Sequence, residues 1–228
     1  MKNFRLIALL AVVMLFSCKK NSDDNDRSNV QVINASVNSG AIDVMTPTYP
    51  LAQNVAYGFS SGYQNVPSGM NLNATVNITG NPTVWASGGI NLTSGQNYTI
   101  IASDYVNAMK VGILLDDLTP PPAGQSKIRF FHLSKTTPPV DIQIGSTTVF
   151  TQRSFNDYLS NSQLGNFTNL TVPGGVPVNI SAYVYGAGGL LYTLPSVTFQ
   201  PGKIYTLVLI GELGGTGNSD LRCVLVYN

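Results

Sequence analysis

The chain has 228 residues, enough for one large or two modest domains, and only 10% of them are charged. The formal net charge is +1, from 12 basic and 11 acidic side chains, so the composition offers no excess of bases to neutralise a run of phosphates. This balance argues against nucleic acid as a partner. The 22 glycines and 13 prolines favour many short strands joined by turns.

The first residues are typical of an export signal. Lys2 and Arg5 precede an apolar run at 6–16, which is too short for a membrane span of about 20 helical residues. The run ends in Leu15-Phe16-Ser17-Cys18, which resembles the lipobox of bacterial lipoproteins. That resemblance implies a signal peptide at 1–17 and acylation of Cys18, whose fatty chains would hold the mature protein on a lipid bilayer.

Residues 18–28 are predicted to be the lipidated cysteine and a flexible tether. Positions 19–29 hold lysine, aspartate, asparagine and serine but no apolar residue, so they cannot bury enough surface to fold. The lysine-then-acidic order resembles the signal of surface-exposed lipoproteins of the Bacteroidetes, and a plain solvated spacer is the alternative. We therefore expect a cell-envelope lipoprotein, anchored in the outer membrane and exposed at the surface.

The rest of the chain is predicted to be a duplication. Its period near 100 residues is that of a domain rather than of a solenoid unit. The offset between the copies grows along the chain, which predicts an insertion in the second copy within about 151–165. Four segments align in order: 29–36 with 127–134, 41–44 with 139–142, 66–69 with 172–175, and 92–99 with 199–206.

The two copies predict two domains, at 29–118 and 127–228. Three prolines lie between them, so the segment 119–126 is predicted to be a short, stiff linker that limits the relative orientation of the domains.

Each copy shows the pattern of strands rather than helices. Alternate apolar residues at 72, 74, 76 and 78 share one face of a predicted strand, and only 155–164 hints weakly at a helical period. We predict an all-β fold of two tandem β-sandwich domains, immunoglobulin-like or transthyretin-like, after the signal peptide. The predicted strands are 30–35, 71–78, 98–102, 110–115, 128–133, 140–144, 178–185, 205–210 and 222–226.

Several motifs resemble the family of the domain of unknown function 4397. In the second copy they are His132-Leu133-Ser134, the run 138–142, and a glycine shortly before Tyr205-Thr206; in the first copy they are Asn34-Ala35-Ser36, Asp43-Val44, 54–58 and Tyr63 before Val66-Pro67. The resemblance covers nearly all of 29–228. Two positions depart from it: Asn34 replaces the more usual histidine, and 153–156 replaces an expected Val-Ala-Tyr-Gly. The resemblance implies cell-envelope β domains, often duplicated, with no established activity.

His132 is the sole histidine, and with Ser134 and Asp141 nearby it allows a Ser-His-Asp hydrolase to be considered. The first copy argues against this, because it has an asparagine in place of the histidine and asparagine cannot shuttle protons. We therefore expect these positions to brace turns of the fold, with the hydrolase as an alternative. The structural motif positions are Asn34, Asp43, His132, Ser134 and Asp141.

Metal and cofactor sites are not expected. Zinc requires several Cys, His or carboxylate ligands, and the chain is poor in these. Asp104, Asp116 and Asp117 could meet a calcium ion, but we favour a solvated loop. Cys223 lies in an apolar strand pattern and is expected to be a buried, inert thiol.

Aromatic residues are the remaining candidates for ligand contacts. Trp85 aligns with Tyr192 at an offset of 107, which suggests a shared packing position. The main hypothesis is a non-enzymatic surface module for binding, adhesion or structure, which contacts an extracellular protein or polysaccharide. A glycan-binding lipoprotein is an alternative. Tyrosines that could be exposed contacts are Tyr49, Tyr57, Tyr63, Tyr183 and Tyr185.

Overall fold

The computed structural model describes residues 26–171 and 175–228, and nearly all the regular structure within these ranges is β. The described strands form four sheets, which make two sandwich-like domains, so the predicted all-β fold is confirmed. The predicted signal peptide, Cys18 and most of the predicted tether lie outside the described residues. Within the described ranges, no helix has the length and apolar character to cross a membrane.

The first sandwich pairs the sheet β4-β1-β7-β8 with the sheet β3-β2-β5-β6. Strands β1 and β7 run parallel, and the other neighbours are antiparallel. The strands are β1 (Arg27–Asn34), β2 (Ile42–Met45), β3 (Pro50–Val55), β4 (Gln64–Pro67), β5 (Gly69–Ile78), β6 (Val84–Leu92), β7 (Asn97–Ser103) and β8 (Lys110–Leu115).

The second sandwich repeats this order, with β12-β9-β15-β16 facing β11-β10-β13-β14. An immunoglobulin sandwich would place strands A, B, E and D in one sheet. Here the first strand of each domain instead lies between the fourth and the seventh, so the transthyretin-like alternative fits. The strands are β9 (Ser126–His132), β10 (Val140–Ile144), β11 (Thr147–Arg153), β12 (Thr168–Leu170), β13 (Val178–Val184), β14 (Leu190–Val197), β15 (Ile204–Ile210) and β16 (Arg222–Tyr227).

The predicted insertion lies between β11 and β12 of the second sandwich. It contains two 3-10 helices, η2 (Asp157–Leu159) and η3 (Ser162–Gly165), which replace the weakly predicted α-helix at 155–164. Two further 3-10 helices, η1 (Val106–Ala108) and η4 (Gly217–Ser219), follow β7 and β15.

Two of the predicted alignments between the copies shift by one or two residues. Val66 pairs with Ser28 and Leu170 pairs with Ser126, so Leu170 is the counterpart of Val66 and the match of 66–69 with 172–175 is wrong. Residues 172–174 lie outside the described ranges. The match of Trp85 with Tyr192 is also wrong, by one residue, because the strand pairings make Ala86 the counterpart of Tyr192. The strands there contain β-bulges, and one extra residue shifts the alignment of every later position.

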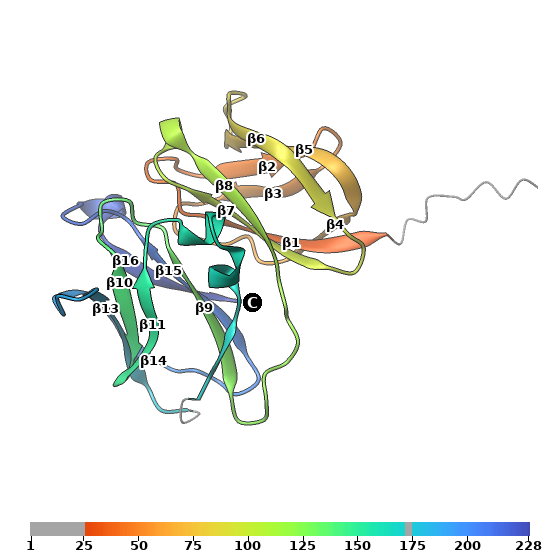
Figure 1. The fold of residues 1–228 in the computed structure, drawn as a ribbon. Helices are drawn as coiled ribbons and strands as arrows, with labels where there is room; N and C mark the ends of the chain where they lie inside the picture. Colours follow the sequence, from red (N-terminus) through yellow and green to blue (C-terminus); the bar gives the residue numbers. More distant parts are fainter. Residues whose placement is uncertain (1–25, 172–174) are drawn as a thin grey trace, which may run out of the picture.

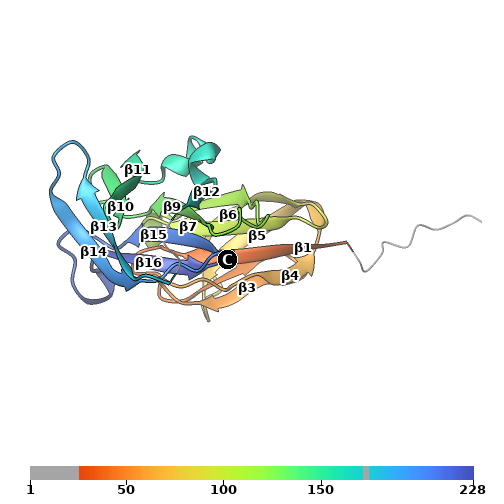
Figure 2. The same ribbon diagram turned by 90° about the horizontal axis from the view of Figure 1, so that it is seen from below.

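The two sandwiches pack together through their sheets that contain β1, β7, β9 and β15 (Figures 1 and 2). These four strands are buried on both faces for most of their length. Even-numbered residues of β1 and β9 face the core of their own sandwich, and odd-numbered residues face the other sandwich. The shared core, rather than the stiffness of the linker, sets the orientation of the domains. Its buried members are Ile33, Ala35, Ile101, Leu114, Phe131, Leu133, Tyr158, Val208 and Ile210.

Candidate functional site

A buried ion pair crosses the interface between the two sandwiches. Arg129 projects from β9, and Asp116 follows β8 directly. The Arg129 Nη1 lies 2.5 Å from the Asp116 Oδ1, and the two side chains are 1% and 0% exposed. Each charge is deprived of water, so each depends on the other and on hydrogen bonds for its stability.

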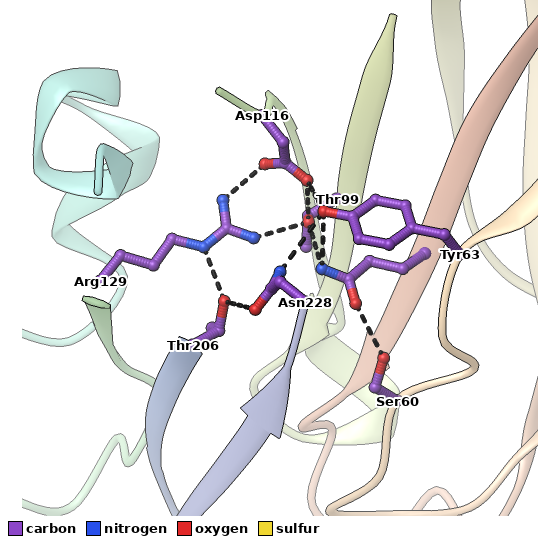
Figure 3. Close-up of polar contacts among 8 residues, drawn as sticks. Ser60, Tyr63, Thr99, Asp116, Arg129, Thr206 and Asn228 are labelled. Carbon is purple, nitrogen blue, oxygen red and sulfur yellow. Dashed lines mark hydrogen bonds and ion pairs between the residues drawn. The ribbon is translucent and has the colours of Figure 1, made fainter. Parts of the chain in front are cut away.

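Hydrogen bonds surround this pair on every side (Figure 3). The Arg129 guanidinium also donates to Thr206 Oγ1 at 2.8 Å and to Thr99 Oγ1 at 2.7 Å. The Tyr63 hydroxyl donates to Asp116 Oδ2 at 2.6 Å. Burial, followed by the charge of Asp116, raises the pKa of Tyr63, so the phenol stays neutral and acts as a donor. The network therefore satisfies the carboxylate from both domains.

The network has an approximate internal symmetry. The strand registers make Gln31 the counterpart of Arg129, because they face Thr99 and Thr206 at the same place in β7 and β15. Asp116 and Asn228 are also counterparts, since each follows the last strand of its sandwich. The two copies thus meet through the same face. The acid is supplied by the first copy and the base by the second.

The aromatic residues beside the ion pair also occupy equivalent positions in the two copies. The counterpart of Tyr63 is Phe167, because the next residue of each copy, Gln64 or Thr168, pairs with the first strand at equivalent places. Phe167 packs against the Arg129 guanidinium, with the guanidinium carbon 4.2 Å from the ring centroid. A phenol that donates to the acid is thus replaced by a ring face that stabilises the base.

Two further aspartates pair with bases of the second domain. Asp104 Oδ1 lies 2.9 Å from Lys135 Nζ, and Asp117 Oδ2 lies 3.0 Å from Lys127 Nζ. The interpretation of Asp104 and Asp116 as part of a solvated loop is wrong, because both are buried. Hydrogen bonds from Thr119, followed by Lys127, lower the pKa of Asp117 to about 2. In the described ranges, no three His, Cys, Asp or Glu side chains gather as a metal site would require.

His132 and Asn34 occupy equivalent, fully buried positions at the ends of β9 and β1. The Asn34 amide donates to the carbonyls of Gly40 and Val55, both at 2.9 Å. The His132 Nε2 lies 3.1 Å from the carbonyl of Pro138, the counterpart of Gly40. Both side chains therefore hold the loop that follows their strand.

We expect the free energy of unfolding to fall below neutral pH because of His132. Burial lowers its pKa, so protonation favours the unfolded chain, in which a histidine titrates near pH 6.5. The stability is then complete above about pH 6.5 and is lost below it, by up to about 1.4 kcal/mol per pH unit. His132→Asn, which installs the first copy's residue, should flatten this profile in urea titrations at several pH values. Parallel profiles for the two proteins would contradict the assignment.

The other motif residues also make hydrogen bonds within their own copy. Asp43 accepts from the backbone N–H of Asn54 at 2.7 Å, and Asp141 accepts from that of Gln152 at 2.9 Å. Asn54 and Gln152 both have a positive φ, 54° and 52°, so each aspartate holds a strained bulge of the adjacent strand. Ser134 Oγ lies 2.5 Å from Thr137 Oγ1. The described contacts thus direct Ser134 and Asp141 away from His132.

The tyrosines that were expected to contact a ligand differ in how far the structure leaves them accessible. Tyr57 packs against the shared core and has Arg222 over its ring, and Tyr63 belongs to the buried network, so both side chains are half-buried and already in contact with the protein. Tyr183 and Tyr185 lie at the end of β13, where Tyr183 is half-buried and Tyr185 is exposed. Tyr49 hydrogen-bonds to the carbonyl of Pro67.

Cys223 lies in the core of the second sandwich, where burial raises the pKa of its thiol to about 12. The thiol is therefore protonated and unreactive at neutral pH.

A cleft of about 710 Å³ lies beside the network, where the insertion of the second copy approaches the end of the first sandwich. Its volume and its position between domains are typical of ligand sites. Most of its exposed polar side chains are neutral amides or hydroxyls. Its lining includes Gln96, Asn97, Leu115, Asp117, Thr119, Ser162 and Asn166.

The sequence model of the domain of unknown function DUF4397 matches residues 28–143. The chain belongs to this family. The match is a single one, which spans the first sandwich and continues through β9 into β10 of the second. The DUF4397 identity of the second copy therefore stays a prediction, and the identical strand order supports it. No curated protein matches the chain.

Among solved structures, this DUF4397 chain is similar to CBMbc, a carbohydrate-binding module of family CBM26 from Eubacterium rectale Amy13K, in complex with maltoheptaose. The identity is 10%, and the alignment covers 87% of this chain and 96% of the module, with a TM-score of 0.25. A TM-score this low gives no support to any argument about the fold or the ligand.

Proposed function

We propose that the chain is a lipid-anchored, non-enzymatic binding module of the cell envelope, whose interdomain cleft takes an extracellular polysaccharide. The observation that carries this proposal is the cleft itself, about 710 Å³ in volume and lined from both domains. Pockets of roughly 300–1,000 Å³ at domain junctions are the usual places for ligands.

The lining of the cleft suits hydroxyl groups. Gln96, Ser162 and Asn166 are exposed in it and can both donate and accept hydrogen bonds. The exposed side chain of Leu115 adds an apolar surface, against which the carbon-bound hydrogens of a sugar ring can pack. Asp117 is the one exposed charge in the lining, and it is already paired with Lys127.

A binding role is also supported by what the reactive residues do. His132 holds the loop at Pro138, and Ser134 pairs with Thr137. Asp116 is bound by Arg129. These contacts assign structural tasks to residues that a hydrolase would need free in an open site. The lipobox at 15–18 supports the anchor.

One experiment tests both the anchor and the cleft. Cells that produce the full chain are mixed with fluorescent starch, xylan and mannan, and retention is measured by flow cytometry. We expect the wild type to retain at least one polymer. Cys18→Ala should release the protein from the membrane fraction and abolish retention. Asn166→Trp should leave the protein on the cells but fill the cleft, so retention is lost.

Thr148→Trp is the matched control, because Thr148 is exposed on β11 outside the cleft and its variant should retain the polymer. Retention by Asn166→Trp at the wild-type level would reject the cleft. Retention of no polymer by the wild type would reject the polysaccharide. If protease added to intact cells left the wild type undigested, the surface location would be wrong.

A further inference from the structure

The first sandwich contains an apolar cavity that is separate from the interdomain cleft. It has a volume of about 120 Å³ and lies between β6 and β8, the edge strands of the two facing sheets. Its lining is mostly aliphatic, and it reaches inward to Val44 and Ile100 of the core. The side chains that matter below are Ala74, Val76, Ala86, Gly88, Val111 and Ile113.

The second sandwich shows what fills this place when it is closed. In the first copy, Ala86 pairs with Val76, which in turn pairs with Val44 of β2. In the second copy, Tyr192 pairs with Ala182, which pairs with Ile142, the counterpart of Val44. Tyr192 is therefore the counterpart of Ala86.

The same strand pairing also identifies the counterpart of the next inward-facing residue of β6. Gly88 pairs with Ala74, and Leu194 pairs with Ile180, so Leu194 is the counterpart of Gly88. Tyr192 and Leu194 both pack against the core of the second sandwich. The first copy therefore lacks a phenol ring and an isobutyl group that the second copy has at this place.

On the other side of the cavity, residues of β8 are more exposed than their counterpart in the second sandwich. Val111 of β8 and Cys223 of β16 are counterparts, because they pair with Ala102 and Leu209 at equivalent places. Cys223 is 4% exposed, whereas Val111 is 40% exposed. Ile113, the next inward-facing residue of β8, is also exposed. The first sandwich therefore keeps an open apolar cavity where the second is closed by its own side chains.

We propose that this cavity binds a small aromatic compound, with its ring in the place that Tyr192 takes in the second sandwich. The size fits, because an apolar protein cavity of about 150 Å³ accepts benzene and stays free of water when empty. A planar ring also suits the narrow space between two sheets, which pack about 10 Å apart. The aliphatic lining offers contacts to the ring and few to a charged group.

The probe is p-cresol, the side-chain analogue of tyrosine, titrated into the full chain in detergent and followed by calorimetry. We expect saturable binding and a rise in the melting temperature with p-cresol concentration. The variant Ala86→Tyr with Gly88→Leu transplants the filling groups of the second copy. It should weaken p-cresol binding by more than about tenfold. A Cβ at Gly88 meets no atom within 4 Å, so the strand can accept the substitution.

Gly88→Leu alone gives a second test if the double variant does not fold, and it should also weaken binding. The matched control is Asn73→Leu, which adds the same side chain on the exposed, outward face of β5 and should bind like the wild type. No saturable heat up to the solubility of p-cresol would overturn the proposal. Unchanged affinity in both filled variants would overturn it too. Neither result bears on the interdomain cleft, because Ile113 is the one residue that lines both sites, and none of these variants changes it.

Discussion

Replacing Asp116 with alanine is expected to lower the free energy of unfolding by about 3–5 kcal/mol. The substitution leaves the Arg129 guanidinium, 1% exposed, without its counter-ion. Thr99 and Thr206 can still accept its other hydrogen bonds, but they carry no charge. The Tyr63 hydroxyl also loses its acceptor. Urea denaturation followed by circular dichroism measures the effect.

Asp117→Ala is the matched control for this loss. Its carboxylate also pairs with a base across the interface, but the side chain is 65% exposed, so the cost should be below about 1 kcal/mol. Replacing the buried pair by Asp116→Leu with Arg129→Met should recover most of the stability, since no unpaired charge remains. Equal losses in Asp116→Ala and Asp117→Ala would show that the buried pair has no special role.

The sequence predicted strands best where apolar residues alternate or run together. The expected strands 110–115 and 140–144 coincide with β8 and β10. Strand β6 was not predicted, because four of its nine residues are small and two of these, Gly88 and Gly89, interrupt its pattern. The short, polar edge strands β4 and β12 were not predicted either. Most of their side chains are exposed, so the sequence shows no apolar pattern there, and only the pairing within the sheet defines them.

Of the two residues that form the interdomain ion pair, only Arg129 has a recognisable signal in the sequence. Arg129 stands inside a strand that is otherwise apolar, and a charge at such a place is a signal of a buried partner. The alignment of 29–36 with 127–134 also places it opposite Gln31. Asp116 could not be chosen among the aspartates near the linker, because that choice depends on how the two sandwiches meet. Sequence periodicity defines the faces of a strand but not which domain covers them.

Phe131→Ala is expected to cost about 3–5 kcal/mol and, in addition, to uncouple the two sandwiches. Phe131 is fully buried in the shared core, where its ring meets Tyr158 edge-on at a centroid distance of 5.0 Å. The guanidinium carbon of Arg129 lies 5.1 Å from the same ring. Truncation removes contacts that belong to both domains, so cooperative unfolding of the pair should be lost.

Two probes separate the domains in this experiment. Trp85 is the sole tryptophan and packs against the core of the first sandwich, so its fluorescence reports that domain alone. Circular dichroism reports both. The two transitions should coincide in the wild type and separate in Phe131→Ala.

Phe130→Ala is the control for the size of the cavity. Phe130 is the neighbouring residue and is equally buried, but it faces the core of the second sandwich, where its ring lies 5.7 Å from that of Phe150. Its truncation costs a similar amount but leaves the shared face intact, so the two probes should shift together. If they separated equally in both variants, the loss of coupling would follow from weakening the second sandwich itself. If they coincided in both, contacts other than Phe131, such as the Asp116–Arg129 pair, would be sufficient to couple the domains.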